Sequence, residues 1–105
     1  MSGPLYLVVW EFQVKPESLA EFELNYGPDG LSSKLFRHSP AYLGTDLLRD
    51  ATRAGRYLTI DRWTSREAFR QFKQQNAAEY AALAKEFEQL TESEALIGDF
   101  ESGAS

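Results

Sequence analysis

Asp61 and Trp63 stand two residues apart at the end of a strand-like run, RYLTIDRW (56–63), that continues into a helix-like stretch. Side chains alternate across a strand with a period of two, so both residues share one face of the sheet with Tyr57 and Thr59. A carboxylate beneath a layer of helices must be hydrogen-bonded, paired or protonated, and burial raises its pKa. Such an aspartate can hold a ligand hydroxyl or act as a general base.

Asp61 and Trp63 also have structural interpretations. Asp61 can form an ion pair with a neighbouring arginine at the rim of the sheet, which contributes about 0 to 1 kcal/mol. Trp63 can fill the core at the end of a strand, or its ring can form a cavity wall while its indole N–H orients a ligand. Tyr57 is nearer to the preceding turn, where a structural role is favoured. The sequence leaves both interpretations of Asp61 and Trp63 open.

His38, the only histidine, is a third candidate for acid–base chemistry. It lies in RHSP, within a connection where a histidine is typically exposed, and its functional interpretation is a general base at the mouth of a cavity. The chain has no cysteine and no second histidine, so a thiolate or histidine-rich metal site is excluded. No glycine-rich phosphate loop is present either. We therefore expect no metal and no other cofactor.

The composition predicts one globular domain over residues 1–105, because 43% of the residues are hydrophobic and 13% aromatic. The formal net charge is −5, and no basic residue follows Lys85, which argues against a nucleic-acid partner. The apolar run at 5–10 is too short to span a bilayer and follows no basic segment, so we expect neither membrane association nor a targeting signal. Together with the lack of cysteine, this indicates a cytoplasmic protein.

Strand-like and helix-like segments alternate along the chain. Strands are expected at 5–14, 41–50, 56–63 and 95–100, with helices at 16–26 and 64–90, the second one interrupted at Asn76, and one helical turn within 27–40. Gly55 suits the turn of a hairpin, and Thr64 with Glu67 has the spacing of a capping box. The order β-α-β-β-α-β predicts an α+β fold of the ferredoxin-like type, an antiparallel sheet with helices on one face.

The first and third strands are apolar on both faces. Tyr6, Val8, Trp10, Phe12 and Val14 share one face of the first strand, Leu5, Leu7 and Val9 share the other, and Leu58 and Ile60 lie opposite Tyr57 and Trp63 on the third. An antiparallel sheet with one face in water should alternate with polar residues instead. A second copy of the chain is the simplest cover, so we predict a homodimer formed through the sheet face.

With these elements in place, the chain resembles the antibiotic biosynthesis monooxygenase family of the dimeric α+β barrel superfamily. The resemblance rests on VVWEFQVKP, SPAYLGTDLLRD and RYLTIDRWTSREAF and extends over nearly the whole chain; the acid-x-Trp ending at Asp61 and Trp63 is its most specific part. It implies a homodimer with a cavity between sheet and helices in each protomer. The residues that we expect to contact a ligand there are Trp10, Tyr57, Phe72 and Tyr80.

The resemblance implies a cofactor-independent monooxygenase that acts on a small aromatic or polyketide-like compound, with Asp61, Trp63 and His38 as catalytic candidates. Other members of the family degrade haem. Here Phe72 lies near the position where such relatives carry a histidine, and the first strand has no asparagine, which disfavours haem. Two alternatives stay open: a non-catalytic ligand-binding or interaction domain on the same dimer, and a proton-transfer enzyme such as an isomerase that uses Asp61 or His38.

Overall fold

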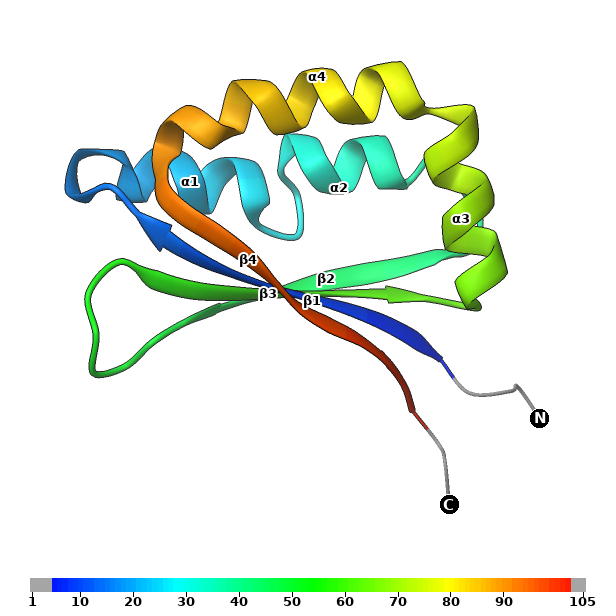
Figure 1. Ribbon diagram of the computed structural model, residues 1–105, viewed down its shortest axis with the longest axis horizontal. Helices are drawn as coiled ribbons and strands as arrows, with labels where there is room; N and C mark the ends of the chain where they lie inside the picture. Colours follow the sequence, from blue (N-terminus) through cyan, green and yellow to red (C-terminus); the bar gives the residue numbers. More distant parts are fainter. Residues whose placement is uncertain (1–4, 103–105) are drawn as a thin grey trace.

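A four-stranded antiparallel sheet carries helices on one face in the computed structural model, which describes residues 5–102 (Figure 1). The elements are β1 (Tyr6–Val14), a 3-10 turn (Pro16–Ser18), α1 (Leu19–Tyr26), α2 (Leu31–Phe36), β2 (Tyr42–Arg49), β3 (Arg56–Trp63), α3 (Arg66–Gln75), α4 (Ala77–Phe87), a second 3-10 turn (Glu88–Leu90) and β4 (Thr91–Glu101). The strand order is β2-β3-β1-β4. This arrangement confirms the predicted α+β, ferredoxin-like class.

Strand β3 shows the predicted alternation most clearly. Tyr57, Thr59, Asp61 and Trp63 are buried, whereas the residues between them are half-buried. The hairpin from β2 to β3 closes where expected, and Gly55 adopts a φ of +82°, a conformation that a glycine reaches without steric cost. Asp61 and Trp63 therefore both face the helices, as the period of two requires.

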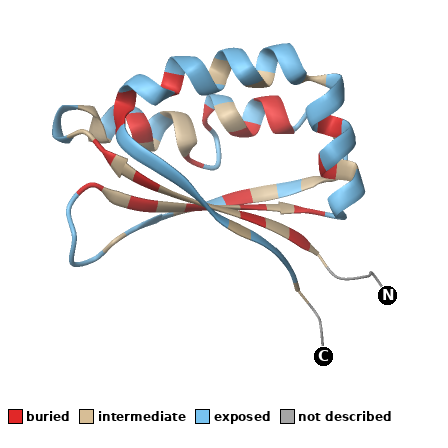
Figure 2. Ribbon diagram, viewed as in Figure 1, coloured by how far each residue is buried: buried red, intermediate tan, exposed pale blue. Residues whose placement is uncertain are grey.

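Buried residues, red in Figure 2, lie on the strands of the sheet and on the helices that cover it. Trp63 lies at the centre of one cluster, where its ring centroid is 5.5 Å from that of Phe36 and 5.2 Å from that of Phe72. Phe22 occupies a second cluster with Tyr57, at a centroid distance of 5.0 Å. These aromatic contacts fix the helices over the sheet, since fully buried rings dominate the packing energy of a small core.

The last strand is longer than the predicted range of 95–100. It begins at Thr91, which pairs with Val14, and follows directly on the 3-10 turn at Glu88–Leu90. The segment TESE (91–94) is polar, exposed after the buried Thr91 and without apolar alternation, so its strand conformation comes from pairing with β1 and not from its own residues. Pattern alone could not reveal it.

The cap of α3 also differs from the expectation by one residue. Ser65, not Thr64, is the N-cap, and its hydroxyl accepts a hydrogen bond from the Ala68 amide at 3.1 Å. Asn76 separates α3 from α4 as predicted, but its side chain donates to the Phe72 carbonyl at 3.0 Å and does not cap α4.

Within residues 5–102, no helix has both the length and the apolar character needed to cross a membrane.

Replacing Ser65 with alanine tests the observed cap. We expect Ser65→Ala to lower the free energy of unfolding by about 1 kcal/mol, because the Ala68 amide loses its acceptor. Thr64→Ala is the matched control and should change it by less than about 0.5 kcal/mol. Urea denaturation followed by circular dichroism measures both, and a larger loss for Thr64→Ala would contradict the assignment.

Candidate functional site

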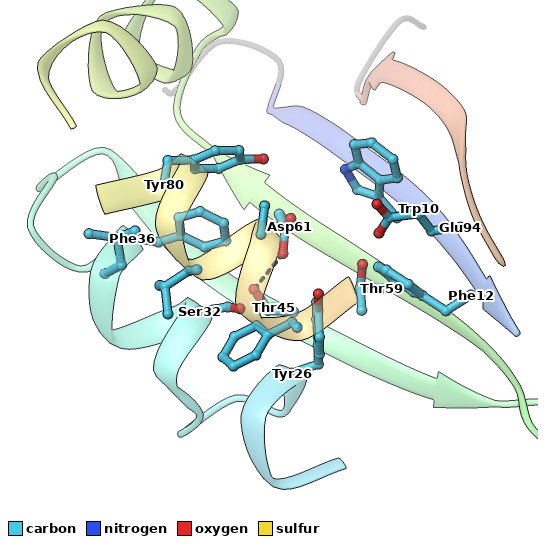
Figure 3. Close-up of a pocket in the computed structure, with 14 residues that line it drawn as sticks. Trp10, Phe12, Tyr26, Ser32, Phe36, Thr45, Thr59, Asp61, Tyr80 and Glu94 are labelled. Atoms are coloured by element: carbon cyan, nitrogen blue, oxygen red, sulfur yellow. Dashed lines mark hydrogen bonds between the residues drawn. The ribbon is translucent and has the colours of Figure 1, made fainter. Parts of the chain in front are cut away.

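A cavity of about 140 Å³ lies between the sheet and the helices (Figure 3). Its aromatic lining consists of Trp10, Phe12, Tyr26, Phe36, Tyr80 and Phe87, and its polar lining consists of Ser32, Thr45, Thr59, Asp61 and Glu94. This volume is close to the roughly 150 Å³ of an engineered apolar cavity that binds benzene. The space therefore suits a small aromatic ligand.

Asp61 is the buried carboxylate of the cavity, with only 7% of its surface exposed. It pairs directly with Thr45 across β2 and β3, and the Thr45 hydroxyl donates to its Oδ1 atom at 2.6 Å. Among residues 5–102, no donor is hydrogen-bonded to Oδ2. Burial raises the pKa of Asp61 from 3.8 to about 6, against the opposing effects of the Thr45 hydrogen bond and the positive charge of Arg62. The carboxylate is therefore a stronger base than an exposed aspartate.

A chain of hydroxyl groups continues behind Asp61. Tyr42 is hydrogen-bonded to Thr45 and donates to Ser33 Oγ at 3.2 Å, and Ser33 Oγ donates to the Gly27 carbonyl at 3.1 Å. Four oxygen–oxygen contacts thus connect Asp61 to Gly27. Each hydrogen bond needs one proton, and the three hydroxyls supply only three. When Asp61 is protonated on Oδ1, the hydroxyl hydrogens can rotate so that this fourth proton completes the fourth hydrogen bond. The chain therefore accommodates both the ionised and the protonated carboxylate.

Two phenols add polar groups from the helical side of the cavity. Burial raises the pKa of Tyr26 and raises that of Tyr80 to about 12. The negative charges of Asp61 and Glu94 contribute to both increases. Both phenols are therefore neutral at physiological pH, and neither makes a hydrogen bond within residues 5–102. Their hydroxyls remain free to contact a ligand.

Glu94 contributes a second carboxylate from β4. Its register opposite Phe12 places it on the helical side of the sheet, where it is exposed at the border of the cavity. Partial burial, and then the charge of Glu88, raise its pKa above the usual value. The cavity thus has one deeply buried acid on β3 and one exposed acid on β4.

The structure brings some of the predicted site residues together and leaves others apart. Asp61, Trp10 and Tyr80 line the cavity. Tyr57 and Phe72 are buried in the two core clusters and do not line it, and the Tyr57 hydroxyl is hydrogen-bonded to Glu23 instead. The expectation that both residues contact a ligand in the cavity therefore does not match their positions.

Trp63 and His38 also lie away from the cavity surface. Trp63 is fully buried behind Phe36, and the expectation that it borders the cavity is wrong. Among the described residues, its Nε1 is the one buried side-chain nitrogen or oxygen without a hydrogen-bond partner. His38 is exposed after α2, outside the cavity lining. Their roles in a reaction stay predictions.

Several lining residues were not predicted, although some left a signal in the sequence. The hairpin that pairs Arg49 with Tyr57 also pairs Thr45 with Asp61, so counting the register would have identified Thr45. Glu94 was missed because the last strand was expected to begin after it. The position of Tyr26 at the end of α1 depends on how that helix docks, which no local pattern reveals.

Over residues 5–102, no group of three or more histidine, aspartate or glutamate side chains is placed to hold a metal ion.

Comparison with known proteins supplies the remaining observations. The family model for antibiotic biosynthesis monooxygenase matches residues 5–86. No curated protein matches the chain in sequence. Among solved structures, the chain is similar to SnoaB, a cofactor-independent oxygenase from Streptomyces nogalater, with a TM-score of 0.77 and 24% identity over 97% of this chain and 96% of SnoaB.

Two further structures share the fold. A Nitrosomonas europaea protein named for the same class of monooxygenase has a TM-score of 0.71 and 16% identity over 99% of this chain and 95% of its own. A MhuD variant, solved with two manganese protoporphyrin IX molecules bound per active site, has a TM-score of 0.65 and 23% identity over 95% of this chain and 96% of its own. At these identities, the likeness concerns the fold.

The buried carboxylate should make stability depend on pH in a recognisable way. Between pH of about 4 and about 6, folded Asp61 holds a proton that it loses in the unfolded chain, so its contribution to the free energy of unfolding falls as the pH rises. A pKa raised from 3.8 to about 6 corresponds to about 3 kcal/mol. We therefore expect Asp61→Asn to be more stable than wild type by up to about 3 kcal/mol above pH 6, and nearly equal to it below pH 4.

Urea denaturation at several pH values measures this difference. Asp29→Asn is the control, because Asp29 is an exposed acid whose side chain is 94% accessible. A stability difference between wild type and Asp61→Asn that stays constant from pH 4 to 7 would show that the Asp61 pKa is not raised.

Proposed function

The chain belongs to the antibiotic biosynthesis monooxygenase family, and from this we propose that it is a cofactor-independent monooxygenase acting on a small phenolic aromatic compound. The observation that carries the proposal is the buried Asp61 carboxylate, which faces an aromatic cavity and has a pKa raised to about 6. The similarity to SnoaB, a cofactor-independent oxygenase, supports it at the level of the fold. The polyketide-like substrates that the resemblance implies are phenols of the same chemical class.

Asp61 acts as the general base in this proposal. It accepts the proton of a ligand hydroxyl and becomes neutral, so the negative charge moves from the protein to the ligand without adding a second charge to the cavity. The proton comes to Oδ2, which has no partner within residues 5–102, while the Thr45 hydroxyl keeps its hydrogen bond to Oδ1. A base whose pKa lies near the working pH suits this step.

The substrate supplies all the electrons of the reaction. The phenolate passes one electron to dioxygen, and the resulting radical pair combines to form a carbon–oxygen bond at a ring carbon that carries hydrogen. The hydroperoxide then breaks its O–O bond and loses water as the ring carbon gives up its proton, which leaves a quinone. One phenol and one dioxygen thus give one quinone and one water, with four electrons moved from the ring to oxygen.

The other residues have supporting roles in the proposal. Trp10 and Tyr80 contact the ligand from the sheet and from α4. Trp63 is a positioning residue, because it holds Phe36 against the cavity from behind. His38 is assigned no role, since it is exposed and lies outside the cavity.

Oxygen consumption tests the base. With phenol and resorcinol as probes, whose single ring suits a cavity of about 140 Å³, we expect uptake in metal-free buffer with a chelator present. Below pH 6, kcat/KM should fall about tenfold per pH unit, because protonated Asp61 cannot accept a proton. Asp61→Asn should abolish turnover at every pH while the protein stays folded, and the quinone should be detected by mass spectrometry.

His38→Asn is the matched control and should keep wild-type turnover. Loss of activity in His38→Asn but not in Asp61→Asn would reassign the base. Binding of the probes without oxygen uptake would favour the non-catalytic ligand-binding domain. Rearrangement of a probe without oxygen uptake would favour the proton-transfer enzyme.

We also propose that two copies associate through the face of the sheet that carries no helices. The apolar residues on this face are Leu7, Val9, Leu48, Leu58, Ile60 and Phe100. Leu48 and Phe100 are 46% and 49% exposed. The ion pairs Arg56–Glu11 and Arg62–Asp46 lie on the same face. A second copy placed here buries the apolar residues and leaves polar groups around them.

A charge on this face should separate the two copies. We expect Leu48→Asp to sediment as a monomer at micromolar concentration, whereas wild type sediments as a dimer, because a buried unpaired carboxylate is costly. Leu24→Asp is the control, since Leu24 is 73% exposed on α1 and should leave the dimer intact. A wild-type protein that sediments as a folded monomer would refute the interface.

A further inference from the structure

The charges around the cavity are all negative. Asp61 and Glu94 are the acidic residues in its lining, and no lysine, arginine or histidine of the described residues joins them. The segments outside 5–102, MSGP and GAS, contain no basic side chain. A bound group in this cavity therefore meets carboxylates and neutral phenols but no cationic side chain.

The nearest basic residues lie outside the cavity. The Lys73 ammonium is 5.6 Å from the centroid of the Tyr80 ring but does not line the space. Arg62 is paired with Asp46 on the opposite face of the sheet, although its charge still lowers the pKa of Asp61. Neither cation is placed to receive a ligand anion directly.

Two carboxylates are among the polar groups that a ligand in the cavity can reach. Asp61 offers its Oδ2 atom, which has no partner within residues 5–102, and Glu94 offers a carboxylate from the other side of β1 (Figure 3). A ligand hydroxyl satisfies each of them by donating a proton. A ligand carboxylate has no proton to donate and would place a second negative charge beside the buried Asp61 carboxylate, where water screens the repulsion only weakly.

We propose that this cavity selects uncharged, single-ring aromatic compounds that carry a hydroxyl group, and that Asp61 and Glu94 determine this specificity by rejecting ligands with a carboxylate. The ligand hydroxyl corresponds to the Asp61 Oδ2 atom, and the single ring corresponds to the volume of about 140 Å³. This inference rests on the proposed function and narrows its substrate class.

A matched pair of probes tests the inference. Resorcinol and 3-hydroxybenzoate have the same ring and substitution pattern and differ in one group, a hydroxyl against a carboxylate. Titrations at pH 7.5, followed through the NMR signal of the Trp10 indole in the cavity wall, measure the Kd of each. We expect resorcinol to bind at least tenfold more tightly.

Variants assign the discrimination to the two acids. Glu94→Gln and Asp61→Asn should each reduce the ratio of the two Kd values by threefold or more, mainly because 3-hydroxybenzoate binds better. Glu92→Gln is the matched control, since it removes the same charge from the same strand at a residue that does not line the cavity, and the ratio should not change.

The outcomes separate this inference from the proposed function. Equal or tighter binding of 3-hydroxybenzoate to the wild-type protein would overturn the charge selection and leave an aromatic site around Asp61 in place. An unchanged ratio in both Glu94→Gln and Asp61→Asn would overturn the assignment to these acids. If neither probe shifts the Trp10 signal, both the inference and the proposed function fail.

Discussion

The hydrogen bond between Thr45 and Asp61 is the contact on which the site depends. A carboxylate that is 93% inaccessible needs a donor, and the pairing of β2 with β3 places the Thr45 hydroxyl opposite it. Thr45 is in turn bonded to Tyr42, which reaches Ser33 on α2. The solvation of one acid on the sheet is therefore linked to the position of a short helix above it, and the cavity keeps its shape only while α2 is docked.

The aromatic core supports this polar arrangement. Trp63 has no hydrogen-bond partner for its indole N–H within the described chain, so the protein accepts an unsatisfied donor at the centre of its packing. The ring is held by Phe36 and Phe72 at centroid distances of 5.5 and 5.2 Å. Phe36 also lines the cavity, so the same side chain packs against Trp63 in the core and borders the space for a ligand.

The sequence was sufficient for the fold because alternation on β3 and the breaks at Gly55 and Asn76 are local signals. It located Asp61 on the helical face for the same reason. It could not distinguish Trp63 as core from Trp63 as cavity wall, because both positions require a buried ring on that face. Glu94 was out of reach since its polar strand forms only by pairing with β1, a contact between residues far apart in the chain.

The polar composition of β4 has a consequence for how copies of the chain meet. This strand lies at an edge of the sheet and carries four acids, Glu92, Glu94, Asp99 and Glu101, without a lysine or arginine. Unpaired backbone groups on an edge invite another strand to add to the sheet, and like charges along the edge oppose such addition. Two β4 edges would repel one another, so the chain is protected against open-ended growth into extended sheets while its apolar face remains available for a closed assembly.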